Sequence, residues 1–362
     1  MYQPEVDIYL DRLNDNFKNL QSIVGKAKIM AVVKSNAYGH GMIPISKQLV
    51  KSGVHGFCVA LATEVEELIG AKINNPILHL GRMHPNYLKI YKTGQVRCTI
   101  NEIDDLQLIK ENFKNINSIN VHLKIDTGMG RMGVPYSKTK DILEILSHIS
   151  SINVEGVYSH FSTAEEQNTD YRDWQLERFN KVVKLTKAFL PNTKYFHIAN
   201  SASILNCPAS HFSMVRPGIS LYGVSPLGVL HDKLKPVMVM KGVVVLKKDI
   251  KDGDSIGYSR LYVSKNDAQI AIVQAGYADG ILTVFSNNGS VLINGSLYSI
   301  IGKVSMDLVS ILCDNRVSIG DEVIFWGSKN NNLEYLAKKY KKIPYEFLTG
   351  VSNRVNRNFI HV

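Results

Sequence analysis

The sequence predicts an α/β protein of two parts, an N-terminal (β/α)8 TIM-type barrel followed by a C-terminal, mainly antiparallel β domain. Two observations predict this fold. Short apolar runs alternate with helix-like segments over the first two-thirds of the chain, and beyond Pro236 such runs are separated by turn signals. The change of pattern places the boundary near residue 232. We therefore expect the barrel over residues 1–232 and the β domain over residues 233–362.

Eight apolar or β-branched runs have the length and composition of buried parallel strands. They lie at residues 29–33, 54–60, 77–80, 96–100, 119–125, 154–159, 194–198 and 213–215. Between them, segments such as 13–24 and 171–190 repeat apolar residues at spacings of three and four, as amphipathic helices do. Eight strand–helix units of this kind are the content of a (β/α)8 barrel.

The C-terminal third of the chain has a different pattern. Apolar runs at residues 237–246, 269–274, 291–293, 308–312 and 323–326 are separated by turn sequences at 251–254, 287–289 and 294–295. Short strands joined by tight turns predict antiparallel pairing. A helix is also expected from about Leu333, and it leads into the basic cluster at residues 338–342.

Composition narrows the class of protein. Of the 362 residues, 45% are hydrophobic and 20% are charged, so the chain can bury a large core without disulfides or structural metals. The four cysteines lie far apart with no Cys-x-x-Cys pair, and we expect no metal site. The N-terminus lacks the features of a signal peptide, and no apolar run reaches the ~20 residues of a bilayer span. These observations predict a soluble, cytoplasmic protein.

The formal net charge of +10 would suit an anionic ligand, a nucleic acid or a membrane surface. The densest basic run, residues 338–342, follows the predicted helix, and the other positive residues are interspersed with acidic ones. This distribution favours a solvated basic face over a nucleic-acid patch. We therefore expect neither nucleic acid nor membrane as a partner, although the charge alone does not identify a small-molecule substrate.

The first predicted strand leads directly into Lys34. A lysine at the mouth of a barrel can be desolvated by the apolar strand before it, which lowers its pKa and allows it to form a Schiff base. Tyr38 and the glycines that follow can bring hydroxyl and backbone donors to an anion. A lone lysine at a strand end is more often an exposed surface residue, so a chemical role for Lys34 depends on the residues that lie near it.

Polar residues also follow the later strands, on the face where barrel enzymes carry their sites. They are Lys124 and Arg131 after the fifth strand, His160 after the sixth, Asn200 and Ser201 after the seventh, and Arg216 after the eighth. The loops after strands 7 and 8 are the usual phosphate site of such barrels, and Ser201 is expected to be a helix N-cap there. A reactive lysine and a phosphate site together suggest pyridoxal 5'-phosphate (PLP).

The same segments resemble the alanine racemase family. The resemblance rests on eight blocks in the family's order, AVVKSNAYGHG, LKIDTGMGRMGV, YSHFSTA, HIANSA, MVRPGISLYG, IGYSRLY, GYADG and GKVSMDLV, from residue 31 to residue 309. It implies a PLP-dependent enzyme that interconverts L- and D-alanine by a two-base mechanism and supplies D-alanine for peptidoglycan. It also implies a homodimer in which each β domain contributes to the active site of the other subunit.

The resemblance implies catalytic roles for four residues. Lys34 would hold the cofactor and act as one acid/base group, and Tyr258 would act as the other from the opposite face. His160 would orient Tyr258, because a phenol is a poor base at neutral pH without help. Arg216 would meet the pyridine nitrogen; a guanidinium stays charged and only donates hydrogen bonds, so the nitrogen beside it stays unprotonated.

The remaining roles concern cofactor and substrate binding. The resemblance implies a phosphate cradle of Tyr38, Ser201 and the backbone amides of Gly218 and Ile219, with Asn200 also at the cofactor. Arg131 and the backbone amide of Met306 would receive the substrate carboxylate, and Tyr277 would narrow the entrance. Lys124 occupies a position that is carbamylated in some members. The sequence departs from some relatives at Asn353, where they place a tyrosine on the cofactor phosphate.

Several alternatives stay open at this point. A broader-specificity amino-acid racemase, acting on serine for example, would share every motif. A PLP-dependent decarboxylase is less favoured, because decarboxylation benefits from a stronger electron sink than a ring nitrogen beside Arg216. A non-catalytic PLP carrier would lack the second domain, and a nucleic-acid-binding role rests on charge alone.

Overall fold

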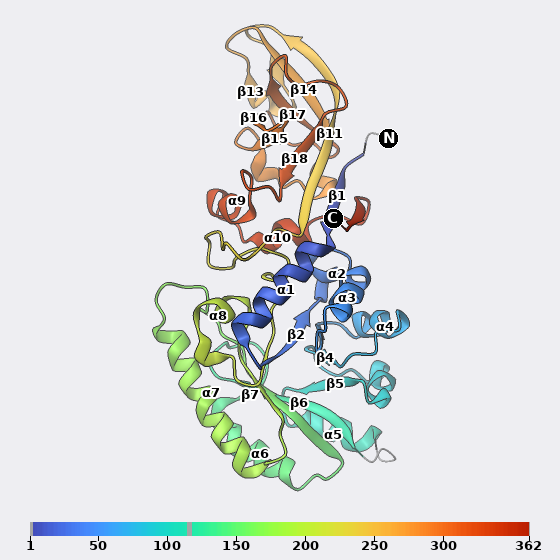
Figure 1. Ribbon diagram of the computed structural model, residues 1–362, viewed down its shortest axis with the longest axis vertical. Helices are drawn as coiled ribbons and strands as arrows, with labels where there is room; N and C mark the ends of the chain where they lie inside the picture. The colour runs from blue at the N-terminus through green and yellow to red at the C-terminus, as the bar shows by residue number, and fades with distance from the viewer. Residues whose placement is uncertain (1–2, 114–117, 362) are drawn as a thin grey trace.

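The computed structural model describes residues 3–113 and 118–361. The described chain forms two bodies stacked along its longest axis, a barrel with its helices at one end and a β domain at the other (Figure 1). Both termini lie on the β-domain side of the junction between the two bodies (Figure 1). None of the helices in the described ranges combines the length and apolar content needed to span a bilayer.

The barrel contains the eight parallel strands that the sequence predicts. In chain order they are β2 (Lys28–Val32), β3 (Gly56–Val59), β4 (Ile77–His79), β5 (Val96–Ile100), β6 (Ile119–Asp126), β8 (Ile152–Tyr158), β9 (Tyr195–His197) and β10 (Met214–Val215). They pair in the order β10-β2-β3-β4-β5-β6-β8-β9, and the short β7 (Val134–Pro135) pairs with β6. The ring is nearly closed between β9 and β10, where the amide of Arg216 donates to the carbonyl of Ala199 at 3.0 Å.

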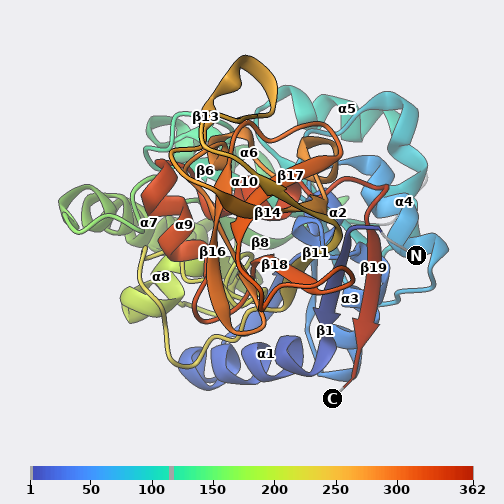
Figure 2. The same ribbon diagram turned by 90° about the horizontal axis from the view of Figure 1, so that it is seen from above.

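Helices cover the outside of this ring (Figures 1 and 2). They are α1 (Leu10–Val24), α3 (Met42–Lys51), α4 (Ala62–Gly70), α5 (Asp104–Asn112), α6 (Thr139–Ser147), α7 (Asp170–Phe189) and α8 (Ser201–Asn206), with the 3-10 segment η1 (Pro85–Thr93) between β4 and β5. Helix α1 illustrates how such a helix packs. Its residues Leu13, Phe17, Leu20 and Val24 share one face of the helix and are buried.

The β domain is built around one antiparallel sheet. Its strands include β11 (Met238–Ile250), β14 (Ala268–Gln274), β15 (Ser290–Ile293), β16 (Ser296–Ile301), β17 (Leu308–Cys313) and β18 (Glu322–Trp326). Their order is β14-β17-β16-β15-β18-β11, and β11 also pairs with β14, so the sheet curls back on itself. A two-stranded ribbon, β12 (Ser255–Ile256) and β13 (Tyr262–Val263), extends from it, and α9 (Leu333–Tyr340) and α10 (Pro344–Thr349) follow.

The first strand of the chain belongs to this second sheet. Strand β1 (Glu5–Tyr9) pairs antiparallel with β11 and parallel with β19 (Asn356–Ile360). Residues 1–232 were expected to form the barrel, and β1 was not predicted, because this five-residue segment carries two acidic residues. One of them, Asp7, is buried and pairs with Lys241 of β11 at 2.5 Å. The charge of Lys241 compensates that of Asp7, so the acidic side chain can be buried in the sheet.

Candidate active site at the carboxyl ends of the barrel strands

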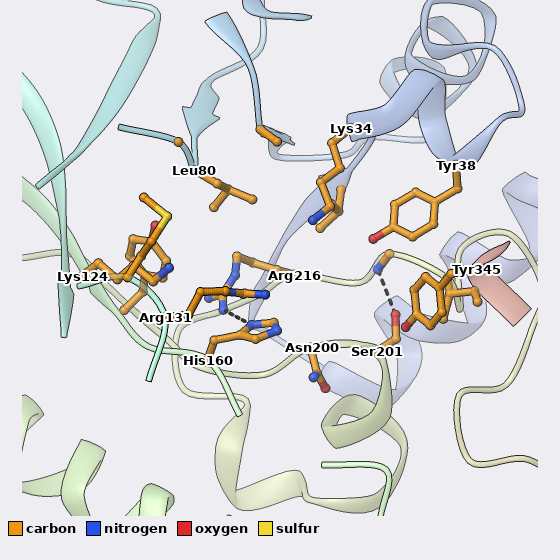
Figure 3. A pocket seen from close by; sticks show the side chains of 17 residues that line it. Lys34, Tyr38, Leu80, Lys124, Arg131, His160, Asn200, Ser201, Arg216 and Tyr345 are labelled. Carbon is orange, nitrogen blue, oxygen red and sulfur yellow. Dashed lines mark hydrogen bonds between the residues drawn. The ribbon is translucent and has the colours of Figure 1, made fainter. Parts of the chain in front are cut away.

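A cavity of about 420 Å³ opens at the carboxyl ends of the barrel strands. Its walls bring together all the predicted site residues of the barrel (Figure 3). These are Lys34, Tyr38, Lys124, Arg131, His160, Asn200, Ser201, Arg216, Gly218 and Ile219. Barrel geometry explains the convergence, because parallel strands end on one face and deliver their following residues to one place.

Lys34 and Tyr38 are placed by an unusual backbone segment, α2 (Lys34–Tyr38). Residues 35–38 all have φ of +53°, so they form a left-handed turn without a glycine. A left-handed conformation costs an L-residue roughly 1–2 kcal/mol, and only Asn36 among the four tolerates it readily. The turn brings both Lys34 and Tyr38 to the cavity wall (Figure 3).

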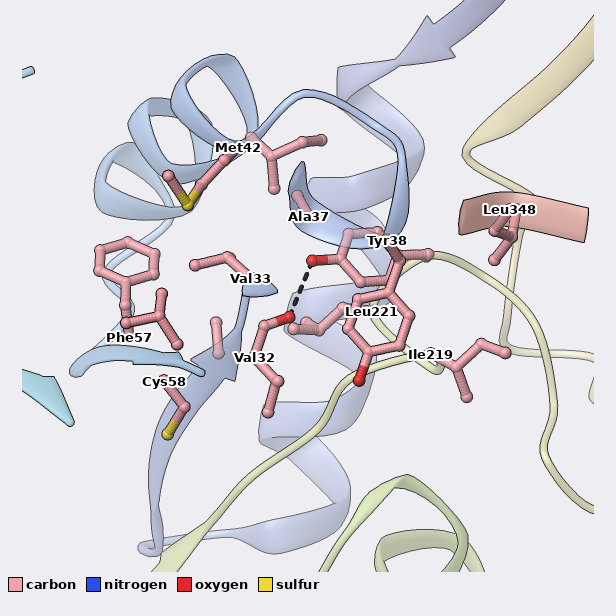
Figure 4. Packing of buried hydrophobic residues seen from close by; sticks show 14 of the residues in the cluster. Val32, Val33, Ala37, Tyr38, Met42, Phe57, Cys58, Ile219, Leu221 and Leu348 are labelled. Carbon is pink, nitrogen blue, oxygen red and sulfur yellow. Dashed lines mark hydrogen bonds between the residues drawn. The ribbon is translucent and has the colours of Figure 1, made fainter. Parts of the chain in front are cut away.

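Hydrogen bonds and packing hold this left-handed turn in place. The side chain of Glu64 accepts from the amide of Ser35 at 2.6 Å, and Asn36 Oδ1 accepts from the amide of Met42 at 2.7 Å. Ala37 and Tyr38 are buried in the cluster shown in Figure 4. A strained backbone segment that its surroundings hold in place in this way is typical of functional sites.

The environment of Lys34 suits a nucleophilic amine. Burial lowers the pKa of Lys34, and the nearby positive charge of Arg131 lowers it further. Both effects favour the neutral amine, which is the form that can attack a carbonyl or accept a proton.

Arg216 is buried, and its partners are neutral. Its Nη2 donates to the carbonyl of Ser159 at 2.7 Å and lies 3.4 Å from His160 Nδ1. Its Nη1 donates to His197 Nδ1 and to the carbonyl of His197. In the described part of the chain, none of the hydrogen-bond partners of Arg216 is a carboxylate. Because a guanidinium cannot accept, His160 Nδ1 and His197 Nδ1 must be the acceptors.

Behind Arg216 lies a buried polar network that the sequence did not predict. His197 Nε2 lies 2.8 Å from His122 Nδ1, and His122 Nε2 lies 3.8 Å from a carboxylate oxygen of Glu155. Arg97 holds Glu155 with two contacts, Nε to Oε2 at 2.6 Å and Nη2 to Oε1 at 3.2 Å. These residues lie inside strands at positions that alternate with apolar ones. The sequence shows each of them only as a single polar residue within an apolar run, and it does not show that they meet.

This network predicts a pH-dependent contribution to stability. Burial alone would raise the pKa of Glu155, but the neighbouring His122 and the hydrogen bonds from Arg97 lower it to about 2. A carboxyl with a lowered folded-state pKa stabilises the fold above its unfolded pKa, and this stabilisation is lost as pH falls toward about 2. Glu155→Gln should therefore reduce the free energy of unfolding at pH ~7 by about 3 kcal/mol, since it breaks a buried pair.

Urea unfolding of both proteins checks this expectation. The difference between wild type and Glu155→Gln should shrink when the pH is lowered from about 7 toward about 3. Glu177→Gln is the matched control, because Glu177 forms an exposed pair with Lys181, and it should change the free energy of unfolding little. A difference at Glu155 that does not vary with pH would contradict the assigned charge state.

The cradle beside Tyr38 is formed by two chain segments. Ser201 Oγ accepts from the amides of Gly218 at 2.8 Å and Ser220 at 3.3 Å. The prediction that Ser201 caps helix α8 was wrong: Asn200 is the N-cap, and its Oδ1 accepts from the amide of Ser203 at 3.1 Å. An asparagine accepts this bond as well as a serine does. The N-cap of α8 is therefore one residue earlier than predicted, and Ser201 lies in the cavity wall.

The opposite wall carries the cationic residues Arg131 and Lys124. The loop that leads to Arg131 is held by Asp126, whose carboxylate accepts from three successive amides, those of Gly128, Met129 and Gly130, at 2.7 to 2.9 Å. Lys124 is buried on β6. Burial lowers the pKa of Lys124 to about 8, with further lowering by Arg131 and Arg216. A guanidinium at this wall is suited to a carboxylate ligand.

Three of the predicted residues do not line this cavity. Tyr258, Tyr277 and Met306 lie in the β domain, with 69%, 46% and 52% of their surfaces exposed. Within the described chain, about half or more of each of these residues stays exposed. They therefore do not complete the site within one chain.

The β domain supplies one residue of the cavity wall that was not predicted, and the position considered for the cofactor phosphate lies outside the cavity. Tyr345, at the start of α10, lines the cavity beside Tyr38, with ring centroids 5.7 Å apart. Asn353 is exposed and does not line the cavity. Helix α10 is only six residues long, so no periodicity could reveal it, and Tyr345 lies far along the chain from every barrel strand.

Two family models match the two parts of the chain. The model for the alanine racemase N-terminal domain matches residues 8–226, and the model for the C-terminal domain matches residues 237–359. The chain belongs to the alanine racemase family. Family members are PLP-dependent, and the chain is a PLP-dependent racemase by this membership. The resemblance seen in the sequence and the predicted fold class are thereby confirmed.

Curated alanine racemases match over nearly the full length. Alanine racemase 1 of Caldanaerobacter subterraneus subsp. tengcongensis is 38% identical, covering 98% of this chain and 94% of the relative. The alanine racemase of Carboxydothermus hydrogenoformans is 36% identical, covering 98% of both chains.

Solved alanine racemase structures have the same overall fold as this chain. The Streptomyces lavendulae enzyme has a TM-score of 0.94 at 28% identity, covering 100% of this chain and 98% of that one. The Bartonella henselae enzyme, solved with covalently bound pyridoxal phosphate, has a TM-score of 0.90 at 28% identity, covering 99% of this chain and 100% of that one.

Proposed function

We propose that this chain interconverts L- and D-alanine with PLP held in the barrel cavity. The observation that carries the proposal is the meeting of Lys34 and Arg216 in one cavity, with only neutral groups accepting hydrogen bonds from Arg216. A lysine with a lowered pKa suits covalent attachment of an aldehyde, and a guanidinium suits an unprotonated ring nitrogen. Supply of D-alanine for peptidoglycan is the cellular role proposed with this reaction.

The residues present fit PLP. Lys34 would hold the aldehyde carbon, Arg216 would donate to the pyridine nitrogen, and Tyr38, Ser201 and the amides of Gly218 and Ile219 would hold the phosphate. A Cβ at Gly218 would lie 2.5 Å from the Tyr38 hydroxyl, so a side chain there would fill the cradle. When bound, PLP withdraws electron density from the α-carbon of an amino acid and makes its hydrogen acidic.

The protein's own residues would then move the proton. Lys34 would accept or return it on one face, and Tyr258 of a second subunit would do so on the other. We propose a homodimer for this reason, with residues 233–362 contributing to the partner's site; the exposure of Tyr258 and Met306 supports it. Because Arg216 leaves His160 Nδ1 as an acceptor, the neutral ring carries its proton on Nε2 and can orient a phenol oxygen.

Substrate recognition would use the cationic wall. Arg131 would receive the carboxylate of alanine with help from the Met306 amide, and Tyr277 would narrow the entrance. We also propose that Lys124 is carbamylated, since its pKa of about 8 makes the neutral amine available near neutral pH. Native mass spectrometry checks this, and a CO2 adduct that persists in Lys124→Ala would contradict the assignment.

The experiment for the proposed function follows L-alanine labelled with deuterium at the α-carbon. The PLP-loaded protein should remove deuterium and abolish optical activity together. Exchange without loss of optical activity would contradict the two-base arrangement, and absence of both would contradict the racemase. The same assay with L-serine decides whether the enzyme has the broader specificity of the alternative.

A further inference from the structure

Helix α7 holds two of the loops that carry site residues, and none of the roles given above involves it. The helix runs along the outside of the barrel (Figure 1). Residues in its first two turns contact the loop after β6, which leads to Arg131, and the loop after β8, which contains His160. The placement of both site residues therefore depends on one helix.

Tyr171 and Trp174 fix the loop that leads to Arg131. The Tyr171 hydroxyl donates to the carbonyl of Gly128 at 2.8 Å. A Cβ at Gly128 would come 2.7 Å from the Trp174 ring and 2.8 Å from the Tyr171 hydroxyl, so the helix leaves room only for a glycine. Gly128 also has φ of +142°, a conformation that favours glycine. Since the carboxylate of Asp126 accepts from three amides of the same loop, the loop is held from two directions.

Gln175 fixes the loop that contains His160. Its side chain is fully buried, and its amide group bridges two residues of that loop. Nε2 donates to the carbonyl of His160 at 3.1 Å, and Oε1 accepts from the amide of Ser162 at 3.0 Å and from the Ser162 hydroxyl at 3.1 Å. A carboxamide both donates and accepts, so it satisfies these groups without burying a charge. The bonds fix the backbone from which the His160 side chain reaches the cavity wall.

We propose that Tyr171 and Gln175 are positioning residues of the racemase site. Tyr171 acts through Arg131, and Gln175 acts through His160. The inference rests on the proposed function, which gives Arg131 the substrate carboxylate and gives His160 the orientation of the Tyr258 phenol. Residues 171 and 175 are four apart and share one face of α7, so a single helix sets the distance between the carboxylate site and His160.

The test of Tyr171 uses propionate, which is alanine without its amino group. Tyr171→Phe removes one hydrogen bond to the loop, and because 43% of Tyr171 is exposed the variant should fold as wild type does. The inhibition constant of propionate and the KM of alanine should both rise roughly three- to tenfold, the effect of one hydrogen bond. The kcat and the Kd of PLP should stay near their wild-type values. An unchanged inhibition constant, or an equal loss of affinity for PLP, would overturn the inference.

The test of Gln175 measures exchange of α-deuterium from each enantiomer of alanine. Gln175→Met keeps the length of the side chain and removes both hydrogen-bonding groups. Exchange from the enantiomer that is slow in Tyr258→Phe should fall by about tenfold or more, because a small misplacement of a reacting group is costly. Exchange from the other enantiomer, which depends on Lys34, should stay within about twofold of wild type. Equal slowing from both enantiomers is the result of a general loss of structure and would overturn the role of Gln175.

Lys181→Gln is the matched control on the same helix. Lys181 is exposed and pairs with Glu177 at 2.8 Å, so this variant should match wild type in both assays. Wild-type values in both Tyr171→Phe and Gln175→Met would overturn the inference and leave the racemase intact. A wild-type protein that neither exchanges α-deuterium nor is inhibited by propionate would instead overturn the proposed function, and this inference with it.

Discussion

Lys34→Ala should lower the rate of alanine racemisation by at least about a thousandfold and abolish covalent attachment of PLP. The variant loses the nucleophile that would hold the cofactor and one of the two groups that would move the α-proton. The lowered pKa of Lys34, caused by burial and by Arg131, favours the neutral amine that both proposed tasks need. Racemisation is measured by coupled detection of D-alanine, and attachment by borohydride reduction and mass spectrometry.

The control for this variant is Lys89→Ala. Lys89 is exposed, forms a surface ion pair with Glu66 at 3.6 Å and lies outside the cavity, so its loss should leave both measurements unchanged. Full racemase activity in Lys34→Ala would contradict the assignment of this residue. Retained covalent attachment at another lysine would contradict its role in holding the cofactor.

Tyr258→Phe should lower racemisation by about a hundredfold or more while leaving the affinity for PLP near that of wild type. The change removes only the hydroxyl, and the expected loss is that of one acid/base group. The effect should depend on direction: α-deuterium should still exchange with solvent from the enantiomer that Lys34 deprotonates, and much less from the other. Exchange rates for both enantiomers provide the measurement.

Tyr262→Phe provides the comparison for the second variant. Tyr262 lies on β13, four residues after Tyr258, packs beside the small cluster that contains Ile256 and has no proposed role. We expect it to racemise alanine at the wild-type rate. Equal slowing of exchange from both enantiomers in Tyr258→Phe would exclude a base that serves one face.

The sequence predicted the barrel and the residues at its mouth because parallel strands are buried on both faces. All eight runs were rich in apolar or β-branched residues despite single polar residues within several of them, and the residues at and after their ends line the cavity. Strand β1 escaped prediction because Asp7 is buried through its pairing with Lys241. Strand β16 escaped it because polar and apolar residues mix along its six residues, and burial follows the sheet contacts instead.

The features missed at the site depend on contacts between distant segments. No residue type in Ser35-Asn36-Ala37-Tyr38 announces a left-handed turn, since Glu64 and Met42 hold it from outside the segment. Tyr345 reaches the cavity only because α10 packs on that turn. The residues beyond Arg216 in the buried network are likewise joined across strands β5, β6, β8 and β9. Local patterns carry no information on such pairings.

The most direct measurement is activity after mixing two inactive variants, Lys34→Ala and Tyr258→Phe. In a mixed dimer, one site combines both substitutions, and the other combines an intact Lys34 with an intact Tyr258 from the partner. Random exchange of subunits should therefore restore about a quarter of the wild-type rate of D-alanine formation. No recovery after verified subunit exchange would contradict the account that two chains build each racemase site.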